Sequence, residues 1–120
     1  MQNFKLTLSV FSLILFASIA NAEPMSFKGT CTLNQTSPDH TLAGREIVNG
    51  RADVVLRDDV FTASFIDYDG EKKQIKSPKL SIRLNDGVMA LSGMQWIAKN
   101  NRTYYVITNS LKMSFDKCTQ

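Results

Sequence analysis

The chain has 120 residues, of which 43% are hydrophobic and 21% charged, and its formal net charge is +3 at pH 7. This length predicts one small domain, and so low a charge gives no reason to expect nucleic acid as a partner. With one histidine and two cysteines, the chain has too few of the usual ligands for a structural zinc site.

The first 22 residues have the pattern of a cleaved bacterial export signal. Lys5 is followed by a nearly continuous apolar run from Leu6 to Ile19, which ends at Ala20-Asn21-Ala22, the small-x-small pattern that signal peptidase recognises. The run is too short for a comfortable transmembrane helix. We therefore expect a signal peptide over 1–22, one domain over 23–120, and a periplasmic or secreted product without stable membrane insertion.

The two cysteines, Cys31 and Cys118, lie near the two ends of the expected mature domain. An even number of cysteines in an exported protein predicts a disulfide. The alternatives are two free thiols, for which the single histidine, His40, would be the only imidazole base, and a metal site, which lacks further ligands. We expect the disulfide.

Residues 34–44 have the composition of a surface loop, with a single helical turn over 41–48 as the alternative. Beyond residue 45, apolar and polar side chains alternate between turn signals, which is typical of antiparallel strands. Three strong turn dipeptides, Asn49-Gly50, Asp69-Gly70 and Asp86-Gly87, predict hairpins. About eight strands follow, at 26–33, 45–49, 51–57, 60–67, 72–84 with a break at Pro78, 88–98 with a bend at Gly93, 103–108 and 111–117.

This spacing predicts an all-β fold, a small antiparallel meander that forms a closed or flattened barrel. A β-sandwich is the alternative. In either case the disulfide ties the first strand to the end of the last, so segments 26–33 and 111–117 should pair or pack side by side.

Alternation also predicts which side chains point inward. Phe61, Ala63 and Phe65 share one face, and Leu80, Ile82 and Leu84 are expected to share the buried face of another strand. Trp96 alternates with Met94 and Ala98 and should point into the core.

Two segments, 88–91 and 103–108, are apolar on both faces, which indicates either strands covered on both sides or strands with an exposed patch. Tyr, Met and Arg are enriched in protein contacts, so the candidate partner-binding residues are Met89, Arg102, Tyr104 and Tyr105. The alternative is that the aromatic and Met side chains fill the barrel.

A second candidate site is basic. Lys72, Lys73, Lys76, Lys79 and Arg83 lie within twelve residues of one another. They are either an anion-binding patch or lysines of a solvated strand edge, where charge discourages pairing with other sheets.

No catalytic, cofactor or metal-binding motif stands out, so we expect no catalysis and no cofactor. Small exported disulfide-closed β-domains without such motifs are commonly binders, and we expect a binding or inhibitory module that acts through a protein partner. A barrel that carries a small apolar ligand or lipid is the alternative. A cell-wall hydrolase is less favoured, because the sequence marks no pair of carboxylates.

Overall fold

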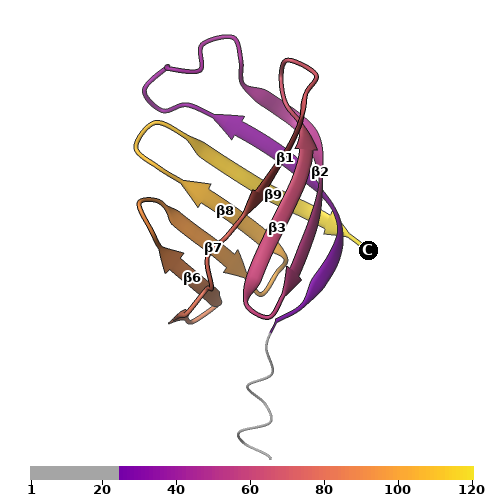
Figure 1. Cartoon of the computed structure of the whole chain (residues 1–120), viewed down its shortest axis with the longest axis vertical. Helices are drawn as coiled ribbons and strands as arrows, with labels where there is room; N and C mark the ends of the chain where they lie inside the picture. Colours follow the sequence, from indigo (N-terminus) through magenta and orange to yellow (C-terminus); the bar gives the residue numbers. More distant parts are fainter. Residues whose placement is uncertain (1–24) are drawn as a thin grey trace, which may run out of the picture.

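The computed structural model describes residues 25–120, which form nine strands and contain no helix able to cross a membrane (Figure 1). The expected signal peptide, 1–22, lies outside the described residues. The strands are β1 (Phe27–Thr36), β2 (Ile47–Arg57), β3 (Val60–Ile66), β4 (Lys72–Lys76), β5 (Ile82–Leu84), β6 (Gly87–Leu91), β7 (Gln95–Lys99), β8 (Thr103–Ile107) and β9 (Lys112–Thr119).

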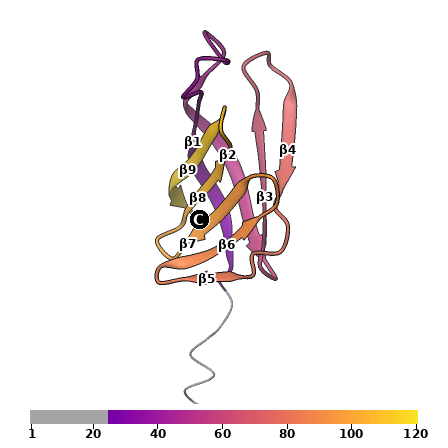
Figure 2. The same cartoon turned by 90° about the vertical axis from the view of Figure 1, so that its left-hand side faces the viewer.

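All nine strands belong to one antiparallel sheet in the order β4-β3-β2-β1-β9-β8-β7-β6-β5. Strands that follow each other in the chain pair with each other, except that β4 and β5 lie at opposite edges. The sheet curls into a half-barrel, and Figure 2 shows β4 along the right-hand side and β5 across the bottom of the domain. The fold is therefore the expected all-β meander, but the barrel stays open between β4 and β5.

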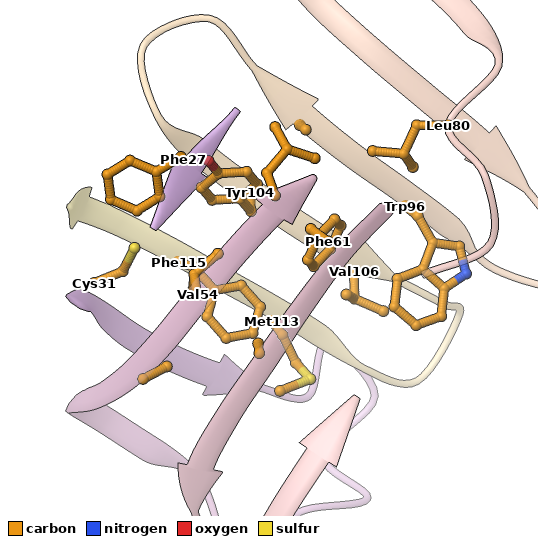
Figure 3. Close-up of a cluster of buried hydrophobic side chains, with 14 of the residues drawn as sticks. Phe27, Cys31, Val54, Phe61, Leu80, Trp96, Tyr104, Val106, Met113 and Phe115 are labelled. Atoms are coloured by element: carbon orange, nitrogen blue, oxygen red, sulfur yellow. The ribbon is translucent and has the colours of Figure 1, made fainter. Parts of the chain in front are cut away.

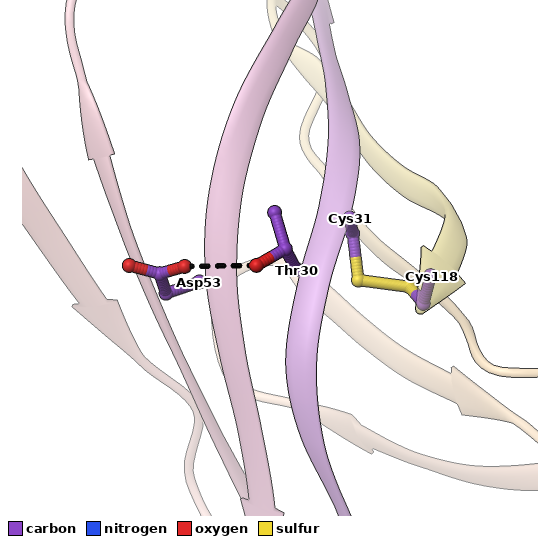
Figure 4. Close-up of a disulfide and its surroundings, with 4 residues drawn as sticks. All are labelled: Thr30, Cys31, Asp53 and Cys118. Carbon is purple, nitrogen blue, oxygen red and sulfur yellow. Dashed lines mark hydrogen bonds between the residues drawn. A yellow bond between two sulfur atoms is a disulfide. The ribbon is translucent and has the colours of Figure 1, made fainter. Parts of the chain in front are cut away.

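The first and last strands pair, as the cysteines predict. Leu33 lies opposite Phe115, and the β1–β9 register shifts between Thr30 and Thr32, beside Cys31. Cys31 and Cys118 form a disulfide, with their Cα atoms 4.0 Å apart (Figure 4). The first and last strands of the described residues thus meet in the middle of the sheet.

The hairpin predicted at Asn49-Gly50 is wrong. Strand β2 continues through both residues, and the register with β1 shifts between Leu33 and Gln35. Asn49 has a φ of 54°, and its backbone N–H donates to Oδ1 of Asn34 at 2.9 Å. The dipeptide forms a β-bulge, because an Asn-Gly pair suits a left-handed residue in a bulge as well as in a tight turn.

Two other turns differ in detail from the sequence prediction. Gly93, with a φ of 73°, lies in a full turn that separates β6 from β7, so 88–98 is two strands rather than one bent strand. The hairpin near Asp86 is present, but its turn is Asn85-Asp86, since Leu84 already pairs with Gly87. A Cβ atom on Gly87 would collide with the carbonyl oxygen of Ala98, so close packing against β7 explains this glycine.

The loop before β2 contains turns instead of a helix. Strand β1 continues to Thr36, and the following residues form successive i to i+3 hydrogen bonds, from the His40 N–H to the Ser37 carbonyl and from the Ala43 N–H to the His40 carbonyl. The turn at Asp69-Gly70 is as predicted, with the Gly70 N–H bonded to the Asp67 carbonyl at 3.0 Å.

Phe61 lies at the centre of the core. Its ring centroid is 5.4 Å from that of Tyr104, 5.7 Å from that of Trp96 and 6.4 Å from that of Phe115, all on the inner face of the curled sheet (Figure 3). Aromatic pairs at these distances stabilise the core beyond the burial of their area. Trp96 points inward, as the alternation predicts.

The connection between β4 and β5 fills part of the opening. The Ser77 N–H donates to the Phe61 carbonyl at 2.9 Å, and the Leu80 N–H donates to the Asp59 carbonyl at 2.7 Å. The connection therefore follows β3 beyond the end of β4. The Leu80 side chain is only 2% exposed and lies near Trp96 and Phe61 (Figure 3). This segment seals one end of the core.

Replacing both Cys31 and Cys118 by Ala should lower the free energy of unfolding by about 4–5 kcal/mol, because the bond constrains the unfolded chain over a sequence separation of 87 residues. Chemical denaturation of the wild type and the double variant measures the difference. A loss below about 1 kcal/mol would contradict the prediction and would mean that the unfolded chain without the bond retains structure that already limits its freedom.

Trp96→Ala should cost about 3–5 kcal/mol of stability, since it removes a buried ring beside Phe61. The neighbouring Gln95 is exposed, so Gln95→Ala should change stability by less than about 0.5 kcal/mol. Equal effects of the two substitutions in thermal or chemical denaturation would contradict the placement of Trp96 in the core.

Candidate protein-binding face

The outer surface of strands β5 to β8 is apolar. The register places Ile82, Met89, Ile97 and Tyr105 opposite one another, in one row across the four strands. Opposite side chains on neighbouring strands lie about 4.5–5.5 Å apart at Cβ, so the four side chains form a continuous row. Ile82 is 40% exposed, at the free edge of the sheet.

A second row lies two residues along the strands, where Leu91 and Ile107 flank Gln95. Leu91 is 62% exposed. All the apolar members of the two rows are half-buried or exposed, while the alternate residues of β6, β7 and β8 form part of the core. We call this surface the outer apolar face, made of Ile82, Met89, Leu91, Ile97, Tyr105 and Ile107.

The sequence pattern at 88–91 and 103–108 allowed either strands covered on both sides or strands with an exposed patch. In the described part of the chain, these strands expose a patch and are not covered on both sides. One expectation is corrected here: Ile82 and Leu84 do not share the buried face with Leu80. Ile82 pairs with Met89, whose neighbours Val88 and Ala90 point inward, so Ile82 points outward.

Tyr105 has two cations beside its ring. The Nζ atoms of Lys99 and Lys112 lie 5.6 Å and 5.7 Å from the ring centroid, at the distance of cation–π contacts. Lys99 also forms an ion pair with Asp86 at 3.5 Å. The outer apolar face therefore contains an aromatic side chain held between basic groups.

Of the four residues predicted to bind a partner, Met89 and Tyr105 lie on the outer apolar face and Tyr104 does not. Neighbouring residues of a strand point to opposite sides, and Tyr104 is the inward one, with an exposed fraction of 0%. It belongs to the core instead of a contact surface. Arg102 is exposed in the β7–β8 turn, with its guanidinium 5.1 Å from the centroid of the Phe27 ring, away from the face.

The predicted basic cluster is divided by the open barrel. Lys72, Lys73 and Lys76 lie on β4 and Arg83 on β5, which are opposite edges of the sheet, and Lys79 lies in the connection between them. Lys73 forms an ion pair with Glu71 at 3.3 Å, and this carboxylate raises the pKa of the Lys73 ammonium. Basic side chains on both free edges, lysines on β4 and Arg83 on β5, discourage pairing with the sheets of other molecules.

Sequence reasoning missed four members of the outer apolar face, namely Ile82, Leu91, Ile97 and Ile107. The two-faced apolar pattern of the strands was the available signal. The missing information was the register, which decides that these side chains share a row with Tyr105 and Met89.

Other groups with possible chemistry lie apart from this face. His40 is exposed in the loop between β1 and β2, and the Ser37 hydroxyl, which donates to the Asp39 carboxylate at 2.7 Å, lowers the pKa of that carboxyl group. Within residues 25–120, no three His, Cys, Asp or Glu side chains are grouped so as to hold a metal ion.

No model of a known protein family matches the chain, and neither a curated protein nor a solved structure matches it.

Tyr104→Phe should leave stability at pH 7 unchanged or raise it by about 1–3 kcal/mol, because the buried hydroxyl has no hydrogen-bond partner among the described residues. Burial raises the pKa of Tyr104 from 10.0 to about 12. The folded protein therefore keeps a proton that the unfolded chain releases, and this contribution to stability is lost as the pH rises from about 10 to about 12.

Denaturation of Tyr104→Phe at several pH values should show a weaker loss of stability in this alkaline range than the wild type. Tyr105→Phe is the control, since Tyr105 lies on the outer surface of the same strand. If the two variants lose stability equally as the pH rises, the Tyr104 hydroxyl does not titrate as described.

Proposed function

We propose that the protein is an exported, periplasmic binding or inhibitory module that acts on a protein partner through the outer apolar face and catalyses no reaction itself. The observation that carries the proposal is the continuous row of half-buried or exposed apolar side chains from Ile82 to Tyr105. A contiguous apolar patch on a small domain commonly marks an interaction site.

The size of the patch fits the centre of an interface. Three strand spacings of about 4.8 Å place Ile82 and Tyr105 roughly 14 Å apart. A standard interface buries about 800 Å² on each partner, with an apolar centre and a polar rim. The outer apolar face supplies the centre, and its lysines supply part of the rim.

The charges beside the face define the chemistry of the partner. Lys112 has no ion-pair partner among the described residues, and Lys99 is bound to Asp86 on one side. A partner with an apolar patch and carboxylates around it would complement these cations, whereas a basic surface would be repelled. We therefore expect a partner that is acidic around its contact patch.

Export is supported by the disulfide between Cys31 and Cys118, since such bonds persist in oxidising compartments outside the cytoplasm. The alternative function, a barrel that carries an apolar ligand or lipid, has less support. The rings of Phe61, Tyr104, Trp96 and Phe115 occupy the inner face, so an internal ligand would have to displace core side chains.

The test compares Tyr105→Asp with Val48→Asp, which places the same charge at a position that is 70% exposed and lies on β2, away from the face. The full chain with a C-terminal tag is expressed in its own host, cross-linked in the envelope, captured and quantified by mass spectrometry. A partner recovered with the wild type and Val48→Asp should fall by about tenfold or more with Tyr105→Asp, as for a residue at the centre of an interface.

Equal recovery of every cross-linked protein with Tyr105→Asp and Val48→Asp would contradict the proposal. Sedimentation of the purified protein is the second measurement. A wild-type dimer that Tyr105→Asp converts to a monomer would identify the face as a contact between two copies, and this too would overturn the proposed role.

A further inference from the structure

The outer surface of strands β1 to β4 carries a group of cations that the sequence does not show as a cluster. The register places Lys28, Val55, Thr62 and Lys76 opposite one another, on β1, β2, β3 and β4. Arg57 lies in the next row, beside Val60. Residues distant in the sequence thus meet on one face, and only Lys76 belongs to the basic run of 72–83.

These side chains surround a surface depression of about 400 Å³. Val55, Val60 and Thr62 line it together with the three cations, and Asp58 is the single carboxylate among its lining residues. Lys28 and Lys76 stand at the two ends of the row, so their long side chains can reach a group that lies over Val55 and Thr62. The depression therefore has apolar side chains between cations.

None of the three cations forms an ion pair in the described part of the chain, although the Asp58 carboxylate lies in the same depression. Neither Lys28, Arg57 nor Lys76 forms an ion pair or a side-chain hydrogen bond there, whereas Lys73 and Lys99 are paired with Glu71 and Asp86. Cations held together on a rigid sheet repel one another, and a bound anion removes that repulsion.

We propose that Lys28, Arg57 and Lys76 form a binding site for an oxyanion of the phosphate class. The guanidinium of Arg57 offers two parallel donors to such a group, and the two lysines add point charges. The hydroxyl of Thr62 lies in the same row, and the side chains of Val55 and Val60 accept an apolar part of the molecule that carries the phosphate.

The site is independent of the proposed protein-binding role. Strand β9 separates β1–β4 from β5–β8 in the sheet, so the oxyanion site and the outer apolar face are on different halves of the outer surface. The same phosphate chemistry occurs in lipid headgroups and in soluble phosphorylated compounds, and the experiment distinguishes these two sources.

The experiment is an NMR titration of the mature domain with pyrophosphate at low ionic strength. The backbone amides of Val55 and Thr62 should shift in a saturable way. The variant Arg57→Gln/Lys76→Gln should bind at least about tenfold more weakly, because it removes charge-assisted hydrogen bonds. The matched control is Arg51→Gln/Lys72→Gln, which removes the same charge beside a neighbouring depression and should change the affinity by less than about twofold.

Two results would overturn the proposal: the absence of saturation by about 10 mM pyrophosphate, and an equal loss of affinity in both double variants, which would indicate diffuse attraction to a basic surface. All of the substituted residues are exposed, so the variants should keep the wild-type spectrum apart from local shifts.

Co-sedimentation with vesicles identifies the source of the phosphate. Binding to phosphatidylglycerol vesicles but not to phosphatidylcholine vesicles, lost in Arg57→Gln/Lys76→Gln and kept in the control, supports the site with a lipid headgroup as its ligand. Saturable binding of pyrophosphate without binding to either vesicle supports the site with a soluble phosphorylated ligand.

Discussion

The rest of the structure depends on the pairing of β1 with β9, which the Cys31–Cys118 bond fixes. Every other pair of strands is adjacent in the chain and joined by a short connection, so its formation costs little chain entropy. The β1–β9 contact closes nearly the whole domain and carries the largest entropic cost. Because the first and last strands meet in the middle of the sheet, the two free edges fall at β4 and β5.

This closure also organises the two surfaces of the sheet. Curling places the aromatic rings around Phe61 on the inside, and the half-barrel needs no second layer to cover them. The outside is then divided at β9 into an apolar half on β5–β8 and a charged half on β1–β4. Alternation along each strand determines which side chains join each surface.

The sequence predicts much of the fold and little of the site. Period-two alternation and turn residues locate most of the strands, and the position of the cysteines predicts the first-to-last pairing. The hairpin predicted at Asn49-Gly50 is wrong, because the same left-handed backbone conformation occurs in tight turns and in β-bulges. The sites are harder to predict from the sequence. Cross-strand register places Lys28 in one row with Lys76, and Ile82 in one row with Tyr105, and no local sequence pattern determines this register.

Tyr104 and Tyr105 show why the surface can change while the fold does not. Tyr104 contacts Phe27 and Phe61 in the core, with ring centroids 6.2 Å and 5.4 Å apart, whereas Tyr105 contacts Lys99 and Lys112 on the outside. A substitution at Tyr105 therefore alters the outer apolar face without creating a cavity. Since strands hold the outer residues in fixed register, affinity for a partner can vary through these positions while the core and the disulfide maintain the domain.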